Sequence, residues 1–148
     1  MRPERKTLPH AIPSWVENGA EYFITVCTRP KGRNQLCRDV TANLIRESLW
    51  FRQDRGELWI HILLLMPDHL HAIMSFSPLV GMEKSLTDWK RYICIKAGIE
   101  WQRDFFDHRL RKDESYLEKA HYIRMNPVRA ALVERPQDWP YAWESRQV

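Results

Sequence analysis

Two periodicities run along the chain and predict a mixture of strands and helices. β-Branched, aromatic and aliphatic residues dominate segments 21–29, 57–65 and 69–76, and such runs are typical of strands. Met66-Pro67-Asp68 separates the second run from the third and predicts a turn, so these two strands form a hairpin. A short aromatic stretch at 105–108 predicts one further strand.

Apolar residues three or four positions apart predict helices over residues 41–55, 85–97 and 113–125. The second of these carries basic residues on one side, and Gly98 follows it at a position suited to ending a helix. The third runs into Asn126-Pro127. We expect this pair to end or kink the helix, because a residue before proline avoids helical backbone angles.

The order of these elements is strand, helix, strand, strand, helix, short strand, helix. It matches an α+β fold of the ferredoxin-like, split βαβ type, with an antiparallel sheet and helices packed on one face. At 148 residues the chain has the size of one domain. We expect an irregular arm over residues 1–20, the body of the domain over 21–134, and an irregular C-terminal extension over 135–148.

Composition and charge are compatible with a nucleic-acid partner without requiring one. The formal net charge is +4, and seven tryptophans offer faces on which unpaired bases can stack, although the core would accommodate them equally well. No apolar run reaches the length of a signal peptide or a membrane span, which predicts a cytoplasmic protein with no membrane partner. The three cysteines show neither metal-site nor disulfide spacing and are expected to be reduced.

The clearest chemical pattern is His69-Leu70-His71 at the start of the third strand. Side chains alternate across a strand, so the two imidazoles point to one face while Leu70 points into the core on the other. Two neighbouring imidazoles make half of a metal site. Spacing alone is only moderately specific, because most such pairs are packing or surface histidines.

A second pattern pairs Tyr122 with Asn126 near the end of the last helix. Residues four apart lie one above the other on a helix, so both polar groups face one site. A nearby cation would favour the phenolate of Tyr122, and the amide oxygen of Asn126 would complete the coordination of that cation. Spacing alone favours the structural interpretation, in which a helix aromatic is followed by a helix-ending asparagine.

Three motifs occur in one order at compatible separations. They are residues 66–71 (MPDHLH), residues 101–108 (WQRDFFDH) and residues 122–130 (YIRMNPVRA). Together they resemble the REP-associated tyrosine transposases, relatives of the single-tyrosine HUH transposases of small bacterial insertion sequences. The resemblance runs from about residue 22 to residue 143. The chain departs from it at Ala131, where family members often have glycine, and this change affects the turn at the helix end.

The resemblance implies an enzyme that cleaves single-stranded or hairpin DNA and transfers the strand through a covalent 5′-phosphotyrosine. It implies that Tyr122 is the nucleophile on the C-terminal helix, and that His69, His71 and Asn126 hold a divalent metal ion, Mg²⁺ or Mn²⁺. Members of this group act as monomers or homodimers, and one chain does not decide between the two states.

Several cations are candidates for gripping the DNA, although each is also explained as an ordinary solvated charge. They are Lys90, Arg91, Lys96, Arg103, Arg109, Arg111 and Lys112. Asp107 and His108 are expected to be structural or to support the metal ligands. His121 points about 100° away from its neighbour on a helix, which makes it a poor base for the tyrosine.

Two other functions fit parts of the pattern. A non-catalytic nucleic-acid-binding module would share the ferredoxin-like fold but needs no HxH pair. A metal-dependent phosphodiesterase would use water as nucleophile and leave Tyr122 with a structural role. A covalent protein–DNA adduct distinguishes the transposase from both alternatives.

Overall fold

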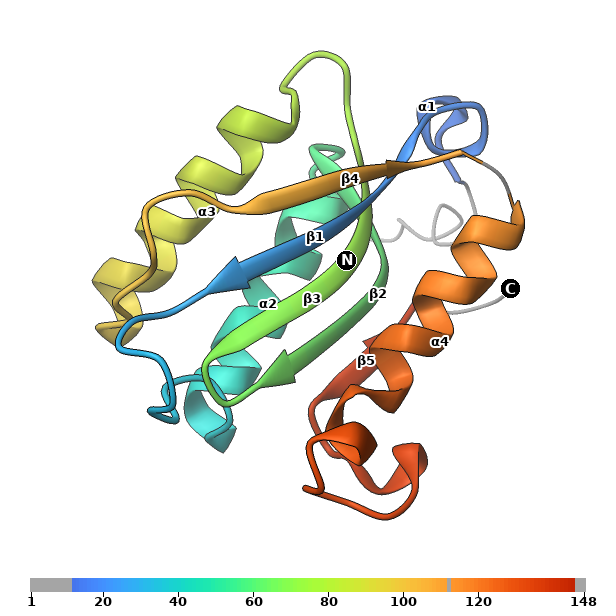
Figure 1. The fold of residues 1–148 in the computed structure, drawn as a ribbon. Helices are drawn as coiled ribbons and strands as arrows, with labels where there is room; N and C mark the ends of the chain where they lie inside the picture. Colours follow the sequence, from blue (N-terminus) through green and yellow to red (C-terminus); the bar gives the residue numbers. More distant parts are fainter. Residues whose placement is uncertain (1–11, 112, 146–148) are drawn as a thin grey trace, which may run out of the picture.

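The computed structural model describes residues 12–111 and 113–145, which contain a five-stranded antiparallel sheet with helices on both sides (Figure 1). In chain order the elements are α1 (Ser14–Glu17), β1 (Glu21–Cys27), α2 (Asp39–Asp54), β2 (Leu58–Met66), β3 (His69–Phe76), α3 (Met82–Ala97), β4 (Phe106–Leu110), α4 (Asp113–Arg129), the 3₁₀ helix η2 (Pro136–Asp138) and β5 (Ala142–Glu144). The predicted strands and helices are all present, and the β2–β3 hairpin turns at Pro67-Asp68 as expected.

The strands lie in the order β4-β1-β3-β2-β5. The first four follow the split βαβ arrangement, since α2 connects β1 to β2 and α3 connects β3 to β4. The predicted ferredoxin-like α+β fold is therefore confirmed. The additional strand β5 pairs with the outer edge of β2.

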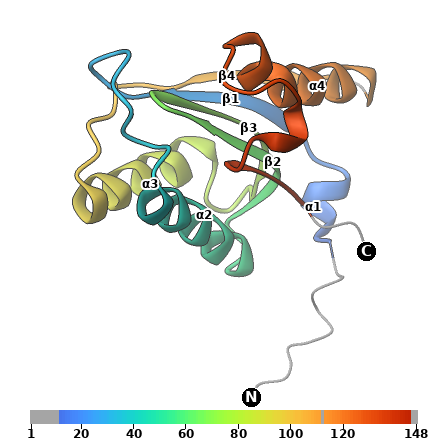
Figure 2. The same cartoon turned by 90° about the horizontal axis from the view of Figure 1, so that it is seen from below.

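The two faces of the sheet carry two hydrophobic clusters. On one face, residues such as Ile24 and Leu70 pack with Trp89 under α2 and α3. On the other face, Phe23 and other residues pack against α4, which lies across the sheet from the paired helices (Figure 2). The prediction of helices on one face holds for α2 and α3, whereas α4 covers the opposite face. An apolar stripe on a helix does not specify which face of a sheet it covers.

The end of α4 differs from the prediction. The helix continues through Asn126-Pro127 to Arg129, with Pro127 buried inside it. Ile123 packs on the sheet and Pro127 is buried, and this burial outweighs the local preference against a proline in a helix. The chain turns at Ala131, whose φ is +60°, and the Leu132 N–H donates to the Pro127 carbonyl at 2.9 Å. In contrast, α3 ends at Gly98 in the left-handed conformation, as predicted.

The C-terminal extension is packed and more regular than expected. Its strand β5 pairs with residues 62–64 of β2, and the Trp139 indole N–H donates to the Leu65 carbonyl at 2.9 Å. A strand of three residues is too short to produce a readable period, and it forms because β2 presents an unpaired edge. Over residues 12–20, the expected irregular arm contains the short helix α1, while residues 1–11 lie outside the described part. Within the described residues, no helix has the length and hydrophobicity needed to cross a membrane.

Candidate active site

The two histidines of the HxH pattern lie side by side on the face of the sheet that α4 covers. His69 and His71 occupy the first and third positions of β3, and their ring centroids are 4.9 Å apart. Leu70, between them, is buried in the cluster under α2 and α3. The predicted alternation is therefore confirmed.

Each imidazole is held through its Nδ1 atom. Asp68 Oδ1 lies 2.8 Å from His69 Nδ1, and Thr25 Oγ1 lies 2.9 Å from His71 Nδ1. An ionised carboxylate only accepts hydrogen bonds, so Nδ1 of His69 carries the proton and its Nε2 keeps a lone pair. The Thr25 hydroxyl fixes His71 in the same sense when it accepts the Nδ1–H bond. Both rings then present Nε2 lone pairs, the atoms that bind a metal ion.

Burial and charge keep His71 in the neutral state that a metal requires. Burial is the main cause that lowers the pKa of His71 to about 3, and the neighbouring His69 and Arg129 contribute in the same direction. For Asp68, burial alone would raise the pKa. The hydrogen bonds from His69 and from the Gly32 N–H outweigh it and place the pKa below the ordinary value. At neutral pH, His71 is therefore neutral and Asp68 ionised.

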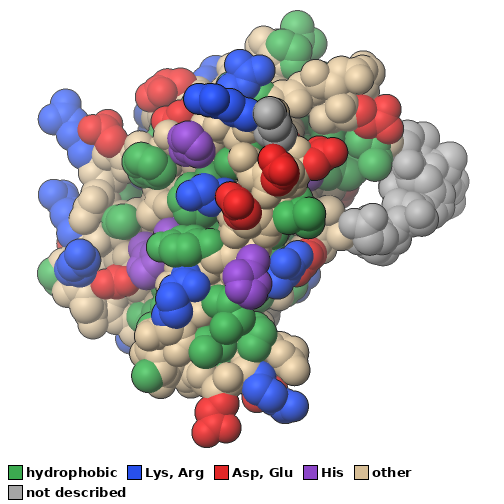
Figure 3. All heavy atoms as spheres, turned by 45° about the vertical axis from the view of Figure 1, so that its right-hand side comes forward, with side chains coloured by type: hydrophobic (Ala, Val, Ile, Leu, Met, Phe, Trp, Pro, Cys, Tyr) green, Lys and Arg blue, Asp and Glu red, His purple; other side chains and the backbone are tan. Residues whose placement is uncertain are grey.

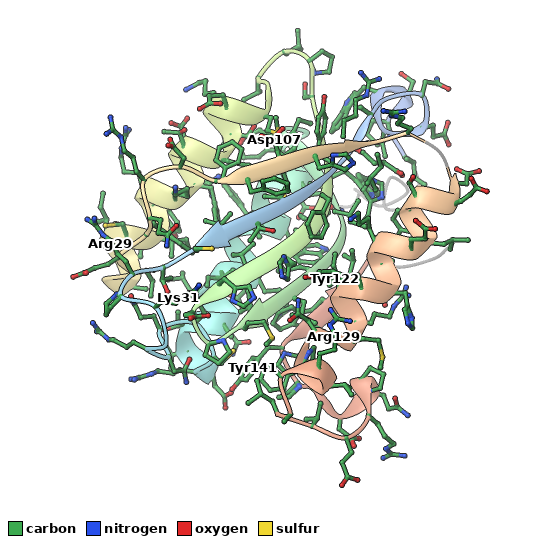
Figure 4. The ribbon with its side chains drawn as sticks, in the orientation of Figure 1. Arg29, Lys31, Asp107, Tyr122, Arg129 and Tyr141 are labelled. Carbon is green, nitrogen blue, oxygen red and sulfur yellow. The ribbon has the colours of Figure 1, made fainter. Side chains whose placement is uncertain are left out.

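Tyr122 extends from α4 toward this pair (Figure 4). Its ring centroid lies 5.8 Å from that of His71 and 6.1 Å from that of Phe23, and 44% of the residue is exposed. Asn126 follows one helical turn later on the same side of α4 and is half-buried. The tertiary fold thus brings together two distant parts of the chain, as the sequence analysis required.

Comparison with known proteins identifies similar sequences and a similar fold. No protein-family model matches the chain. In sequence it is 29% identical to a Haemophilus influenzae protein named "Putative REP-associated tyrosine transposase", over 88% of this chain and 82% of the relative. A second Haemophilus influenzae protein, named only "Uncharacterized protein", is 23% identical over 72% of this chain and 79% of its own length. A solved structure of a REP-associated tyrosine transposase bound to a REP hairpin has the same fold, with a TM-score of 0.73 and 24% identity over 84% of this chain and 76% of that one.

The chain is therefore similar in sequence to a protein named as a REP-associated tyrosine transposase. The resemblance carried by the three motifs is thereby confirmed. The departure at Ala131 falls on the residue with positive φ that ends α4, where glycine would adopt the same conformation more easily.

Two cations of this chain lie against Tyr122, and neither was assigned a role from the sequence. The Arg129 guanidinium carbon lies 4.2 Å from the Tyr122 ring centroid, and Arg129 Nη2 donates to the Tyr122 carbonyl at 2.7 Å. Lys119 Nζ lies 5.9 Å from the same ring. With Asn126 these residues form one polar stripe on α4, at spacings of three, four and three. Arg129 lies seven residues after Tyr122. Because the helix was expected to end before Pro127, Arg129 was not predicted to share a helix face with Tyr122.

A basic loop also borders the histidines and was missed from the sequence. Gly32 donates its backbone N–H to Asp68 Oδ2 at 2.7 Å, so one carboxylate holds both this loop and His69. The loop carries Arg29, Lys31 and Arg33, all exposed and without an ion-pair partner among the described residues. Its three cations in five residues were a readable signal, but their position beside the histidines depends on the tertiary hydrogen bond.

The prediction that Lys90 is one of the DNA-binding cations is wrong, as its surroundings show. It is only 9% exposed, and its ammonium donates to the carbonyls of Gln102, Arg103 and Asp104 at 2.9–3.2 Å. Three acceptors occupy the three N–H bonds of the ammonium. Lys90 therefore holds the segment before β4 and has no bond left for a phosphate.

The other predicted cations are scattered. Arg91 and Lys96 are exposed on α3, which packs on the face of the sheet opposite His71. Arg109 pairs in register with Tyr22, whose side chain packs on that same far face.

Arg103 and Arg111 are exposed on either side of β4, and Lys112 lies outside the described residues. None of the described ones contacts Tyr122 in the way that Lys119 and Arg129 do.

Asp107 and His108 are both exposed on β4, and His121 is exposed on α4. His108 is directly opposite Phe23 and shares its face, whereas Asp107 is opposite Ile24 and faces the other way. In Figure 3, which brings the α4 side forward, histidines lie interspersed among basic, acidic and hydrophobic side chains. The surface near α4 is thus chemically mixed.

The donor set fits a divalent ion with few protein ligands. The described residues contain no group of three or more His, Cys, Asp and Glu side chains suited to holding a metal. They do contain two neighbouring imidazoles, each bonded through Nδ1, and an amide, Asn126, one turn beyond Tyr122 on α4. Such a set leaves coordination positions open for substrate oxygens.

Proposed function

We propose that this protein is a transposase that cleaves single-stranded DNA and transfers the strand through a covalent bond to Tyr122. The observation that carries the proposal is the 5.8 Å separation of the Tyr122 and His71 rings, which come from residues 51 positions apart in the chain. The 29% identity to a protein named "Putative REP-associated tyrosine transposase" supports it.

His69, His71 and Asn126 would hold a divalent cation, Mg²⁺ or Mn²⁺. When bound, that cation supplies Lewis-acid chemistry at a phosphate oxygen. Nitrogen ligands favour Mn²⁺ over Mg²⁺, because the affinity of such sites rises in that direction. Asp68 and Thr25 position the two imidazoles through their Nδ1 atoms, which leaves the Nε2 atoms to face the metal.

Tyr122 performs the covalent step. Its Oη atom forms a bond to the scissile phosphorus while the bond from phosphorus to the 3′ oxygen breaks, so a 5′-phosphotyrosine and a free 3′-hydroxyl result. The phenol proton passes to water, because the tyrosine is exposed. Arg129 and Lys119 lie over the phenol ring and stabilise negative charge at the phenolate and the phosphate. Attack by another 3′-hydroxyl reverses the step and joins the strands.

The nucleic-acid partner is a hairpin with unpaired flanking nucleotides. A relative of the same fold has been solved with a REP hairpin bound. In this chain, Arg29, Lys31 and Arg33 provide positive charge at the histidine end of the site, and Arg129 and Lys119 provide it at the tyrosine end. A strand that connects the two ends passes directly over the candidate metal ligands.

The decisive experiment is trapping of the covalent intermediate. The protein is incubated with a labelled DNA hairpin with unpaired flanks and Mn²⁺, and adducts that survive denaturation are counted on a gel. Tyr122→Phe removes the nucleophilic oxygen and should abolish the adduct while the variant remains folded. Tyr116→Phe is the matched control, because Tyr116 lies on the same helix but packs against His61, and it should retain the adduct.

The same experiment separates the alternatives. Cleavage without an adduct that persists in Tyr122→Phe would identify a phosphodiesterase that uses water. Hairpin binding with neither cleavage nor adduct in the parent protein would identify a non-catalytic binding module. Either result would refute the proposed function.

A further inference from the structure

The aromatic residues of this protein are distributed unevenly between the interior and the surface. None of the seven tryptophans is in the exposed class: Trp89 is fully buried and the others are half-buried, so none of them is as accessible to a base as the exposed aromatic residues. The exposed aromatic side chains are instead Tyr122, Phe51 on α2, and Phe106 in β4, which is 58% exposed. A single exposed apolar side chain is common on a protein surface, so Phe106 is informative only through the residues that surround it.

Phe106 lies on the same face as the candidate active site. It pairs in register with Thr25 in β1, and directly opposed residues of antiparallel strands point to the same side. Thr25 in turn bonds His71. The Phe106 ring lies 6.4 Å from that of Phe23, which lies 6.1 Å from that of Tyr122. Three aromatic rings thus form a continuous row from the edge of the sheet to the candidate nucleophile.

Cations border this row at its inner end. Lys119 Nζ lies 5.3 Å from the Phe23 ring centroid, and Arg129 lies over Tyr122. In Figure 1, α4 crosses only one part of this face, and β4 and β1 lie beyond it. An uncovered aromatic ring at one end of a row and two cations at its other end complement a nucleotide strand, in which a base stacks on the ring while a phosphate further along meets the positive charge.

We propose that Phe106 is a stacking platform for an unpaired nucleobase adjacent to the phosphate that Tyr122 attacks. A base within a duplex has both faces covered by its neighbours, so only an unpaired base has a face available for Phe106. The platform would therefore select single-stranded flanks over a blunt hairpin stem. This inference rests on the proposed function for the identity of the neighbouring phosphate, while the stacking itself is a property of binding.

The test measures binding in EDTA with Tyr122→Phe as the background, so that no cleavage occurs. The probes are a fluorescently labelled DNA hairpin with single-stranded extensions on both sides and the same hairpin with a blunt end. Phe106→Ala should weaken binding of the extended hairpin by about 5- to 150-fold, the loss expected for one base–aromatic stack. It should leave binding of the blunt hairpin unchanged. Phe106→Trp preserves an aromatic face and should bind the extended hairpin like the parent.

Phe51→Ala is the matched control, since Phe51 is 55% exposed but belongs to α2 on the other face of the sheet. It should change neither affinity. Equal affinity of Phe106→Ala and the parent for the extended hairpin would overturn the proposal, as would equal weakening with both probes. If wild-type protein forms no adduct but the selective loss in Phe106→Ala persists, the stacking platform stands and the transferase function fails. The two ideas are therefore separable.

Discussion

The two faces of the sheet use similar residues in different ways. Under α2 and α3, polar groups form hydrogen bonds within the protein. The Trp89 indole donates to Ser48 Oγ at 2.9 Å, and the Lys90 ammonium donates to three backbone carbonyls. On the α4 side, Lys119 and Arg129 lie over aromatic rings. There, each HxH imidazole engages only its Nδ1 atom.

This contrast explains why residue type alone was a poor guide to the DNA-binding cations. Lys90 and Lys119 are both helical lysines, yet the first stabilises a turn and the second borders the candidate site. A buried polar group must be satisfied by the protein, whereas an exposed one remains available to a ligand. The comparison predicts that changes on the α2–α3 face alter stability, while changes on the α4 face alter chemistry and pH response.

The largest effect on stability is expected from Trp89→Ala. The substitution empties a fully buried site and removes the hydrogen bond to Ser48, so the free energy of unfolding should fall by about 3–5 kcal/mol. Urea unfolding measures it. Adduct formation per folded molecule should be unchanged at low temperature. A loss of adduct in the folded fraction would show that this face contributes to the chemistry after all.

The next effect concerns the pH dependence of stability. Burial lowers the pKa of His61 to about 4, and its ring, which packs on Tyr116 of α4, bonds Ser75. The unfolded histidine binds its proton near pH 6.5. Between these values the unfolded state therefore holds more protons, and stability falls as the pH falls from 6.5 toward 4.

His61→Gln should remove this loss, which amounts to about 3 kcal/mol in the parent. Urea unfolding at pH 7 and at pH 4 gives the difference, and the exposed His121→Gln serves as control. A parallel pH dependence in parent and His61→Gln would show that His61 is protonated in the folded protein, with Glu21, 3.9 Å away, as its partner.

A smaller effect, confined to chemistry, is expected from Asp68→Asn. The amide cannot accept from both His69 and Gly32 as the carboxylate does, so the orientation of His69 is lost. Affinity for Mn²⁺, measured by calorimetry, and the rate of adduct formation should each fall by about 10- to 100-fold. Asp107→Asn on exposed β4 should change neither. Unchanged Mn²⁺ affinity in Asp68→Asn would show that Asp68 has no role in metal binding.

The smallest effect is expected at the end of α4. Ala131 adopts a φ of +60°, which costs an alanine about 1–2 kcal/mol relative to a conformation it prefers. Ala131→Gly should therefore raise the free energy of unfolding by about 1 kcal/mol after the greater entropy of unfolded glycine is included. Ala120→Gly, inside the same helix, should lower it by about 1 kcal/mol or more. Thermal unfolding of the Ala131→Gly and Ala120→Gly variants shows whether the free energy of unfolding rises in the first and falls in the second.

Local sequence patterns predicted the positions of the longer helices and strands. The β3 boundaries, the turn at Pro67-Asp68 and the end of α3 at Gly98 match the expectation, because alternation, turn chemistry and glycine conformation act over a few residues. The errors came where distant contacts decide. Pro127 stays helical because its burial outweighs the local preference, and β5 forms because β2 has an open edge.

The amino-acid sequence by itself determined which residues can do chemistry and which of them share a strand or a helix face, since those relations follow from backbone periods of about 2 and 3.6 residues. Only the tertiary structure decided that α4 crosses the face bearing His71, that Asp68 links His69 to the basic loop, and that Lys90 serves the fold. These contacts join residues far apart in the chain, and their choice depends on burying apolar area and satisfying polar groups across the whole domain, which no local pattern encodes.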